Sequence, residues 1–485
     1  MKKYGILLIV ILLFGLLSLA CQKEEVGKIA ITTSSKEAKE NYLKGRDLFE
    51  RLQGQESLKY LNAAIEKDPG FAMAHIFVSF SQPTIQGFFD HLNQAVALKD
   101  KVSEGERLWI EGVKAGTDGY PLKQQQIYEE LVSKFPNDER AHSQLGNNFF
   151  GLQEYEKAIY EYNKVVAINP DFSQSYNQMG YAYRFLKKYK EAEEAFKKYT
   201  ELIPNDPNPY DSYAELLMKT GRYEESIEQY QKALAVNPNF VASHIGIATN
   251  YNFLGQYDKA RAQLERLFDM ARNDGESRAA KLAMTVSYVD EGKMDNALKE
   301  LQWQYELGTK NNDAPNMAGD LILMGNILYE SGKYDEAMKH YKKAHQVISD
   351  SDLSDEVKAN AGRILLYNSA RIAVAKKNFK DAEHSAQELM TSAQSINNTF
   401  QIWLANEVAG MIAMKQKDYD QAIDSFLRAN LQNPYNLYRL AEAYQAAGQQ
   451  AASEDYFAEA ADHNTLNSIQ YAFVRHKAAE KLAAM

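Results

Sequence analysis

The side chains that could carry chemistry do not form a catalytic set in this sequence. Of the nine histidines, His340 and His345 lie five residues apart and do not share a helix face, so no metal-ligand spacing is present. The chain has no glycine-rich phosphate loop, no Gly-x-Ser-x-Gly turn and no HExxH motif. The acidic turn from Asp350 to Asp355 lacks the glycine and final glutamate of a calcium loop, and we interpret it as a helix cap before Glu356. The sequence therefore predicts a protein that is not an enzyme and has no metal or other cofactor.

The one residue suited to covalent modification is Cys21, the only cysteine of the chain. Lys2 and Lys3 precede an apolar run of 15 residues, from Ile6 to Ala20, which ends directly before this thiol. The run is shorter than the roughly 20 residues that a membrane-spanning helix needs. Two lysines, a short apolar run and a small residue at its end are typical of an export signal. A spanning anchor, or a secretory signal with an incidental cysteine, is the alternative.

The end of this signal resembles the lipobox of bacterial lipoproteins. The resemblance rests on Leu17-Ser18-Leu19-Ala20-Cys21, in which Ser18 replaces the usual leucine. It implies that residues 1–20 are a signal peptide and that Cys21 carries palmitate or a similar acyl chain. Gln22 after the cysteine implies the outer membrane of a bacterial envelope, and the run Gln22-Lys23-Glu24-Glu25 is similar to the signal of surface-exposed lipoproteins. Residues 21–36 are then expected to be the lipidated cysteine and a flexible tether, because residues 31–35 lack helical periodicity.

Two residue types recur through the middle of the chain at one interval. The interval is 34 residues for four prolines and four tyrosines: Pro136, Pro170, Pro204 and Pro238; Tyr155, Tyr189, Tyr223 and Tyr257. A unit of this length forms a helix hairpin, which is too small to bury its own apolar face. Consecutive hairpins must therefore stack into one continuous core. The proline ends each unit because it cannot continue a helix.

The units resemble the tetratricopeptide repeat. The resemblance rests on Leu145-Gly146, Phe149, Tyr155, Ala158, Tyr162 and Pro170, and only the leading tryptophan is replaced, by His142. Small residues are expected where two helices cross closely, and in second helices these are Ala158, Ala192 and Ala260. Of the 31 tyrosines, 14 fall at apolar positions of the repeat, among them Tyr155 and Tyr334, and are predicted to pack in the core.

The resemblance implies an all-α, right-handed superhelical solenoid of about twelve helix-turn-helix units. Residues 37–274 would form an N-terminal array that is regular from residue 105, and residues 275–464 a C-terminal array. The repeats of the second array are longer, since its alanines advance by 40, 45 and 40 residues: Ala297, Ala337, Ala382 and Ala422. Residues 465–485 are expected to form an amphipathic helix that caps the stack. Because each repeat would contact only its neighbours, we expect an elongated molecule.

The concave surface of such a solenoid is the predicted binding site for a protein or peptide. Residues offset by half a turn from the packing stripe of first helices should line it. The predicted groove residues are Asn147, Phe150, Asn177, Tyr181, Arg184, Asp211, Glu215 and Asn252. Asparagines could bind a peptide backbone, Tyr181 and Phe150 an apolar side chain, and Arg184 a carboxylate. Tyr181 and Arg184 are expected to support little of the core. The alternative is a groove that is only solvated, since the lysines of the family's carboxylate clamp are missing.

The composition of the chain limits the classes of partner that it could bind. The 55 basic and 65 acidic side chains give a net charge of −10 with no basic stripe, so nucleic acid is an unlikely partner. The prediction is a lipid-anchored, non-catalytic protein-interaction scaffold of the bacterial cell envelope, without a small-molecule cofactor. The alternative is a glycan- or nutrient-capturing lipoprotein of the SusD-like kind, which also carries tetratricopeptide hairpins.

Overall fold

The computed structural model describes residues 27–485, and within that range the regular structure is entirely helical. The first half contains α2 (Lys36–Glu50), α3 (Gly54–Lys67), α4 (Ala72–Ser81), α5 (Ile85–Leu98), the short 3-10 helix η1 (Lys99–Lys101), α6 (Glu104–Thr117), α7 (Pro121–Lys134), α8 (Glu139–Gly151), α9 (Tyr155–Ile168), α10 (Ser173–Phe185), α11 (Tyr189–Leu202), α12 (Asn208–Lys219), α13 (Tyr223–Val236), α14 (Val241–Phe253) and α15 (Tyr257–Asp269). The second half contains α16 (Asp274–Asp290), α17 (Met294–Lys310), α18 (Ala314–Glu330), α19 (Tyr334–Ser349), α20 (Asp355–Ala375), α21 (Phe379–Ser395), α22 (Thr399–Gln416), α23 (Tyr419–Leu427), α24 (Pro434–Ala446), α25 (Gln450–Ala461) and α26 (Ile469–Ala483). The predicted Cys21 site lies outside the described residues.

Helices α2 to α25 pair into twelve successive antiparallel hairpins, and α26 follows them. The prediction of an all-α solenoid is therefore confirmed. Helices α8 to α15 are 12 to 14 residues long, whereas α16 to α22 have 16 to 21. The change begins at α16, where the proline turn of the earlier repeats is replaced by Asn273, whose side chain caps the helix.

Small residues hold each hairpin together at the point where its two helices cross. A Cβ atom built on Gly146 of α8 would lie 2.7 Å from the ring of Tyr162 on α9, so only glycine lets this tyrosine pack so closely. In the same way, a Cβ atom built on Gly180 would lie 2.6 Å from the ring of Phe196. The predicted crossing residues Ala158, Ala192 and Ala260 are fully buried, as expected.

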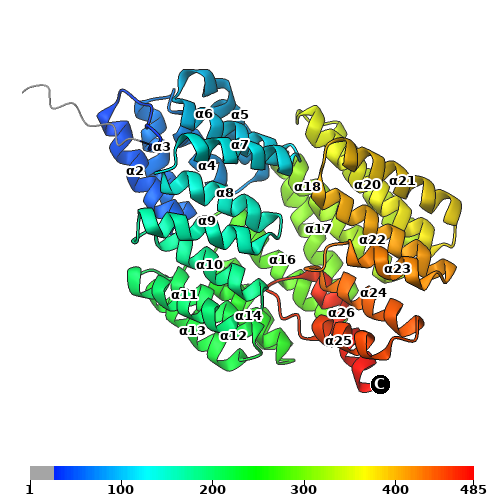
Figure 1. The fold of residues 1–485 in the computed structure, drawn as a ribbon. Coiled ribbons are helices and arrows are strands. Elements are labelled where there is room, and N and C mark those ends of the chain that lie inside the picture. Colours follow the sequence, from blue (N-terminus) through cyan, green and yellow to red (C-terminus); the bar gives the residue numbers. More distant parts are fainter. Residues whose placement is uncertain (1–26) are drawn as a thin grey trace, which may run out of the picture.

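The two arrays curve back toward each other instead of extending in one line. In Figure 1, α2 to α15 lie on the left, α18 to α25 on the right, and α16 between them. The turn after α6 touches the second array, because Asn360 Nδ2 donates to the carbonyl of Asp118 at 3.1 Å and Asn398 Nδ2 donates to that of Gly119 at 2.7 Å. The expectation that each repeat contacts only its neighbours, and with it the elongated shape, is therefore wrong.

The segment 27–35, predicted as part of a flexible tether, lies along the N-terminal repeats. The backbone N–H of Ile29 donates to the carboxylate of Asp138 at 2.9 Å, and that of Thr32 donates to Glu106 at 2.9 Å. The side chain of Ile29 packs on the core of the first repeats. Carboxylates and an apolar surface thus replace the water contacts that a free tether would make. The tether prediction is corrected for these residues, whereas residues 21–26 lie outside the described range.

The final helix does more than cover the end of the stack. α26 packs against α24 and α25, as a cap would, and also against α16. Arg475 of α26 donates to Asp290 of α16, with Nη2 and Oδ2 2.7 Å apart, and to the carbonyl of Asn252 at 3.0 Å. The C-terminal helix therefore joins the two arrays.

Candidate functional site

Four of the predicted groove residues form hydrogen bonds within the N-terminal array. Tyr181 on α10 donates its hydroxyl to Glu215 on α12 at 2.9 Å, and Arg184 donates to the other carboxylate oxygen at 3.0 Å. The Arg184 guanidinium also lies 4.7 Å from the centre of the Tyr181 ring. Asp211, one turn before Glu215, is buried and accepts a hydrogen bond from Ser243 at 2.7 Å. Tyr181 and Arg184 therefore support the packing of successive repeats, and the prediction that they contribute little to the core is wrong.

Burial changes the chemistry of this cluster. The loss of water around Asp211, and secondly the negative charge of Glu215, raise the pKa of the Asp211 carboxyl to about 8. The cation of Arg184 is held by Glu215, so it does not offset the burial of Asp211. The cluster is a partly buried structural network, and Asp211 is mostly protonated at neutral pH.

The other predicted groove residues are also engaged. Asn147 accepts a hydrogen bond from Tyr162 at 2.9 Å, and Asn252 accepts one from Ser287 at 2.8 Å. Phe150 packs edge-on against the rings of Tyr155 and Phe185. Asn177 is buried, and its Oδ1 has no hydrogen-bond partner among the described residues. Partner binding by these residues stays a prediction.

Tyr181, Asp211 and Glu215 do line a cavity, of about 810 Å³, and other segments of the chain form its remaining walls. Residues 52–56 and the end of α4 form one side, and the start of α16 forms another. Arg272 donates to Glu56 at 2.7 Å across this junction. Next to it, the loop between α25 and α26 packs onto the inner face of the N-terminal array, where Lys219 donates to the carbonyl of His463 and Tyr223 to Asn464. Other segments of the protein thus cover part of the concave surface of the first array, beside a cavity that remains.

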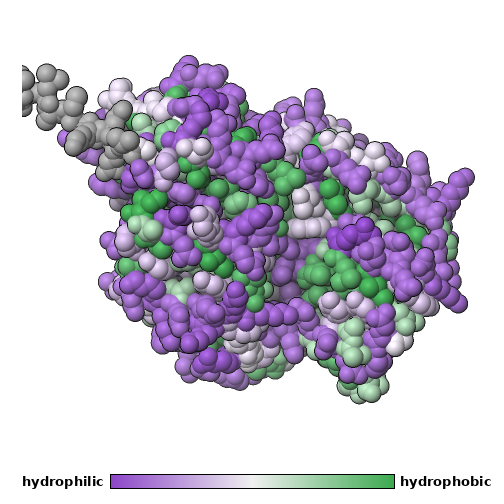
Figure 2. Space-filling view, viewed as in Figure 1, coloured by the Kyte–Doolittle hydropathy of each residue, from purple (hydrophilic) through white to green (hydrophobic). Residues whose placement is uncertain are grey.

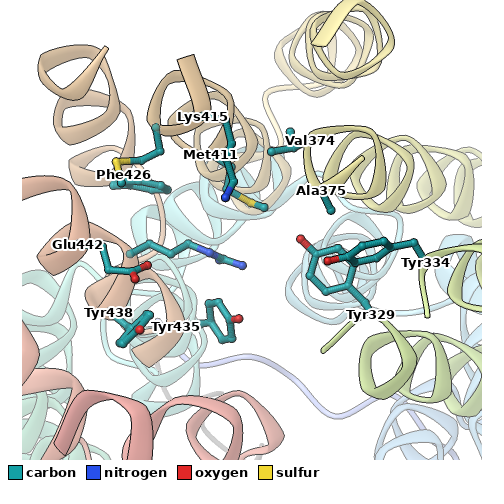
Figure 3. A pocket seen from close by; sticks show the side chains of 12 residues that line it. Tyr329, Tyr334, Val374, Ala375, Met411, Lys415, Phe426, Tyr435, Tyr438 and Glu442 are labelled. Carbon is teal, nitrogen blue, oxygen red and sulfur yellow. The ribbon is translucent and has the colours of Figure 1, made fainter. Parts of the chain in front are cut away.

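A second cavity, which the sequence did not predict, lies on the inner face of the C-terminal array. Its volume is about 270 Å³, and aromatic and methionine side chains form most of its wall. In Figure 3, Tyr329 and Tyr334 stand on one side, Tyr435 and Tyr438 stand across from them, and Met411, Lys415 and Phe426 lie along a third side. Figure 2 shows a hollow between the two arrays with hydrophobic residues gathered beside it over α23 and α24. Tyr334, which was predicted to be a core residue, forms part of the wall of this cavity.

Two buried arginines lie in and beside this wall. Arg439 of α24 lines the cavity, with its guanidinium 3.9 Å from the centre of the Tyr435 ring, and donates to Glu407 of α22 at 2.7 Å. Glu407 also accepts a hydrogen bond from Tyr367 at 2.6 Å. Burial raises the pKa of Glu407, but the charges of Arg439 and Arg371 outweigh it and hold that pKa below its ordinary value. Glu407 is therefore ionised, and it pairs with Arg439.

Arg371 of α20 is the second arginine, and it has no carboxylate partner among the described residues. It donates to the amide oxygens of Asn326 and Asn368 at 3.1 and 3.0 Å, while its Nε has no hydrogen-bond partner. Its guanidinium lies 4.4 Å from the centre of the Tyr329 ring. The signal that could have identified this region was the presence of Tyr329, Arg371, Glu407 and Arg439 on four successive first helices, at intervals of 42, 36 and 32 residues.

Residues 27–485 offer no metal site and no membrane span. No three His, Cys, Asp or Glu side chains in this range are placed to hold a metal ion. None of the helices in the described part of the chain is both long and apolar enough to cross a membrane.

Three family patterns match the middle of the chain. Residues 146–184 match the TPR repeat, and residues 173–206 match the tetratricopeptide repeat. Residues 146–206 are therefore tetratricopeptide repeats. Residues 208–362 match the C-terminal ARM domain of tetratricopeptide repeat protein 21. No curated protein sequence matches the chain.

Solved structures of tetratricopeptide proteins are similar to parts of the chain. A tetratricopeptide repeat protein from Parabacteroides merdae is 17% identical, covers 67% of this chain and 98% of its own, and has a TM-score of 0.33. MamA from Desulfovibrio magneticus is 18% identical over 34% of this chain and 94% of its own, with a TM-score of 0.29. YrrB, described as a TPR protein with an unusual peptide-binding site, is 19% identical. The similarity covers 36% of this chain and 89% of YrrB, with a TM-score of 0.25.

Proposed function

We propose that this chain is a non-catalytic protein-interaction scaffold whose partner contacts the inner face of the C-terminal array. The observation that carries the proposal is the contrast between the two concave surfaces. The N-terminal one keeps a cavity of about 810 Å³, but its polar wall residues such as Tyr181 and Glu215 are hydrogen-bonded to each other, and the loop before α26 packs beside it. The C-terminal one keeps an open cavity walled by Tyr329, Tyr435 and Met411. Aromatic, methionine and arginine side chains are enriched at the centres of protein interfaces.

Affinity capture of envelope proteins tests this proposal. Ala375 lines the cavity, and Ala375→Trp should fill it without changing any of the hydrogen-bonded polar side chains around it. The full-length protein should retain a partner that the Ala375→Trp variant loses. Lys380→Trp, at an exposed position of α21, is the matched control and should retain the partner. If both variants retain it equally, the partner binds elsewhere.

We further propose that Cys21 is lipidated and that the lipid attaches the protein to the outer membrane. Attachment on the outer, cell-surface side of that membrane is the more specific form of this proposal. The support is the signal-like sequence before Cys21. Only six residue steps separate Cys21 from Gly27, whose carbonyl accepts a hydrogen bond from Asn137. Six residues span at most about 21 Å. Lipidation would therefore hold the N-terminal repeats close to the membrane instead of letting the body swing freely.

Mass spectrometry of the mature N-terminus tests the anchor. The expected product begins at Cys21 and carries acyl chains, and Cys21→Ser should release the protein from the membrane fraction. An unmodified Cys21, or a retained signal segment, would show that the attachment is of another kind.

The glycan-capturing alternative is not favoured. All three family patterns that match are of the tetratricopeptide or related ARM kind. The segments that join successive helices are also short, whereas that alternative calls for long binding loops between few repeats.

A further inference from the structure

We propose that the cavity of the C-terminal array takes one large aromatic side chain of the partner, and that an acidic residue next to it in the partner pairs with Arg439 and Lys415. This inference rests on the proposed scaffold function and specifies the chemistry that the scaffold recognises. It concerns an internal segment of the partner rather than a free chain end.

The size and lining of the cavity favour a single anchoring side chain. Its volume of about 270 Å³ lies below the roughly 300–1,000 Å³ of pockets for drug-sized ligands. Tyr329, Tyr334 and Tyr438 present ring surfaces, and Met411 and Met414 can adjust to the shape of a guest. One aromatic ring buried in such a pocket is the usual centre of an interface.

The charge around the cavity favours an anion beside that ring. The cations are Arg371, Arg439, Lys415 and Lys477, and the carboxylates are Glu330, Glu407 and Glu442. Lys477 pairs with Glu330 at 3.0 Å, and Arg439 pairs with Glu407 at 2.7 Å. Glu442 lines the cavity and opposes an anion there, and Arg371, which forms no ion pair among the described residues, acts on Glu407 through its charge. Glu480, whose charge acts on Tyr438, adds a fourth carboxylate, so the cations and carboxylates balance in number. The cations that line the cavity itself, Arg439 and Lys415, are what favours an anion there.

Arg439 lines the cavity and is placed to bind an anion. Only its Nη1 is hydrogen-bonded among the described residues, to Glu407 and to Asn436. The other N–H groups of a guanidinium form a planar fork that suits a carboxylate. Lys415 is exposed at the rim of the cavity and adds a second cation. An acidic residue that flanks the anchoring ring could reach both.

Capped peptides test the inference on the full-length protein in detergent. The probes are acetyl-Ala-Glu-Trp-Glu-Ala-amide, its Gln-Trp-Gln analogue and its Glu-Ala-Glu analogue, so that no probe has a charged end. Binding is followed by the NMR signals of ¹³C-methyl methionine, which report on Met411 and Met414 in the cavity wall. The Glu-Trp-Glu peptide should bind at least about tenfold more tightly than the Gln-Trp-Gln peptide, because hydrogen bonds to charged groups are the stronger ones. The Glu-Ala-Glu peptide should not shift these signals.

Three variants make the result specific to the cavity. Ala375→Trp should abolish binding, and Lys415→Glu should weaken the Glu-Trp-Glu peptide until it binds no better than its glutamine analogue. Lys380→Glu, an exposed lysine of α21, should change neither. Equal binding of the glutamate and glutamine peptides, or undiminished binding to Ala375→Trp, would overturn the inference. If no peptide binds but Ala375→Trp still loses the captured partner, the proposed ligand chemistry is wrong and the scaffold function stands. If no peptide binds and Ala375→Trp retains the partner, both proposals are wrong.

Discussion

Polar residues on the inner faces of first helices pair with the next repeat. Tyr181 and Glu215 are 34 residues apart, at equivalent positions of neighbouring repeats, and Glu407 and Arg439 likewise lie on successive first helices. The sequence predicted the residues that pack within one hairpin, such as Ala192, because they recur with the repeat. It could not show that Tyr181 and Arg184 are partly buried and paired with Glu215, because these contacts depend on how closely successive first helices approach. For the same reason the sequence did not predict the cavity of the second array, where Tyr334 was predicted to be a core residue.

The glycine at each crossing makes a testable prediction. Gly180→Ala should destabilise the protein by about 1–3 kcal/mol, because its Cβ would lie 2.6 Å from the ring of Phe196. Gly319→Ala, inside α18 with nothing within 4 Å, is the control and should stabilise by roughly 0.5–1 kcal/mol. Urea unfolding of the two variants and the wild type gives both values. Equal effects would show that the helix crossings are looser than described.

The pKa of Asp211 predicts a dependence of stability on pH. A folded-state pKa of about 8, above the ordinary 3.8, means that the folded protein binds this proton more tightly. Stability from this group is therefore greatest near pH 4 and falls as the pH rises toward 8. Asp211→Asn should unfold like the wild type near pH 4 and be more stable at pH 8, on the order of a few kcal/mol. Asp352→Asn, at an exposed position, should show no such difference; a constant gap for Asp211→Asn across this range would contradict the assignment.

At the scale of elements, two segments differ from their sequence-based description. The apolar pattern of residues 465–485 correctly predicted α26 but gave no sign of its contact with α16, since Arg475 and Asp290 are 185 residues apart. Residues 27–35 lack helical periodicity because they bind as an extended strap to Glu106 and Asp138, not because they are free. In both cases the missing information is a contact between segments far apart in the chain.

The bond between α26 and α16 predicts the effect of one mutation. Arg475→Ala leaves Asp290, whose side chain is only 3% exposed, without its arginine, and should cost about 3–5 kcal/mol of stability. Arg428→Ala is the matched control, because its partner Asp424 is well exposed, and it should cost at most about 1 kcal/mol. Chemical denaturation measures both, and similar costs would mean that the bond of Arg475 to Asp290 does not hold α26 against α16.

The whole molecule is a solenoid that folds back on itself. The repeat period correctly predicted the number of hairpins and their pairing along the chain. The curvature was not predictable, because it accumulates from small rotations between repeats and is fixed by distant contacts such as that of Asn398 with Gly119. This closure brings other segments of the chain onto the first concave surface, whose polar residues are already paired, whereas the cavity of the second array has a largely aromatic and methionine wall. The proposed recognition surface therefore moves from the first array to the second.

Site-specific photo-crosslinking in the producing cells tests that central claim most directly. A photoreactive amino acid would replace Lys415 at the rim of the C-terminal cavity, Leu52 at the N-terminal cavity, or Lys380 on α21. The account predicts a partner adduct from position 415 that disappears when Ala375→Trp is added, and no comparable adduct from positions 52 and 380. An adduct from position 52 with none from position 415 would contradict it and place recognition on the first array.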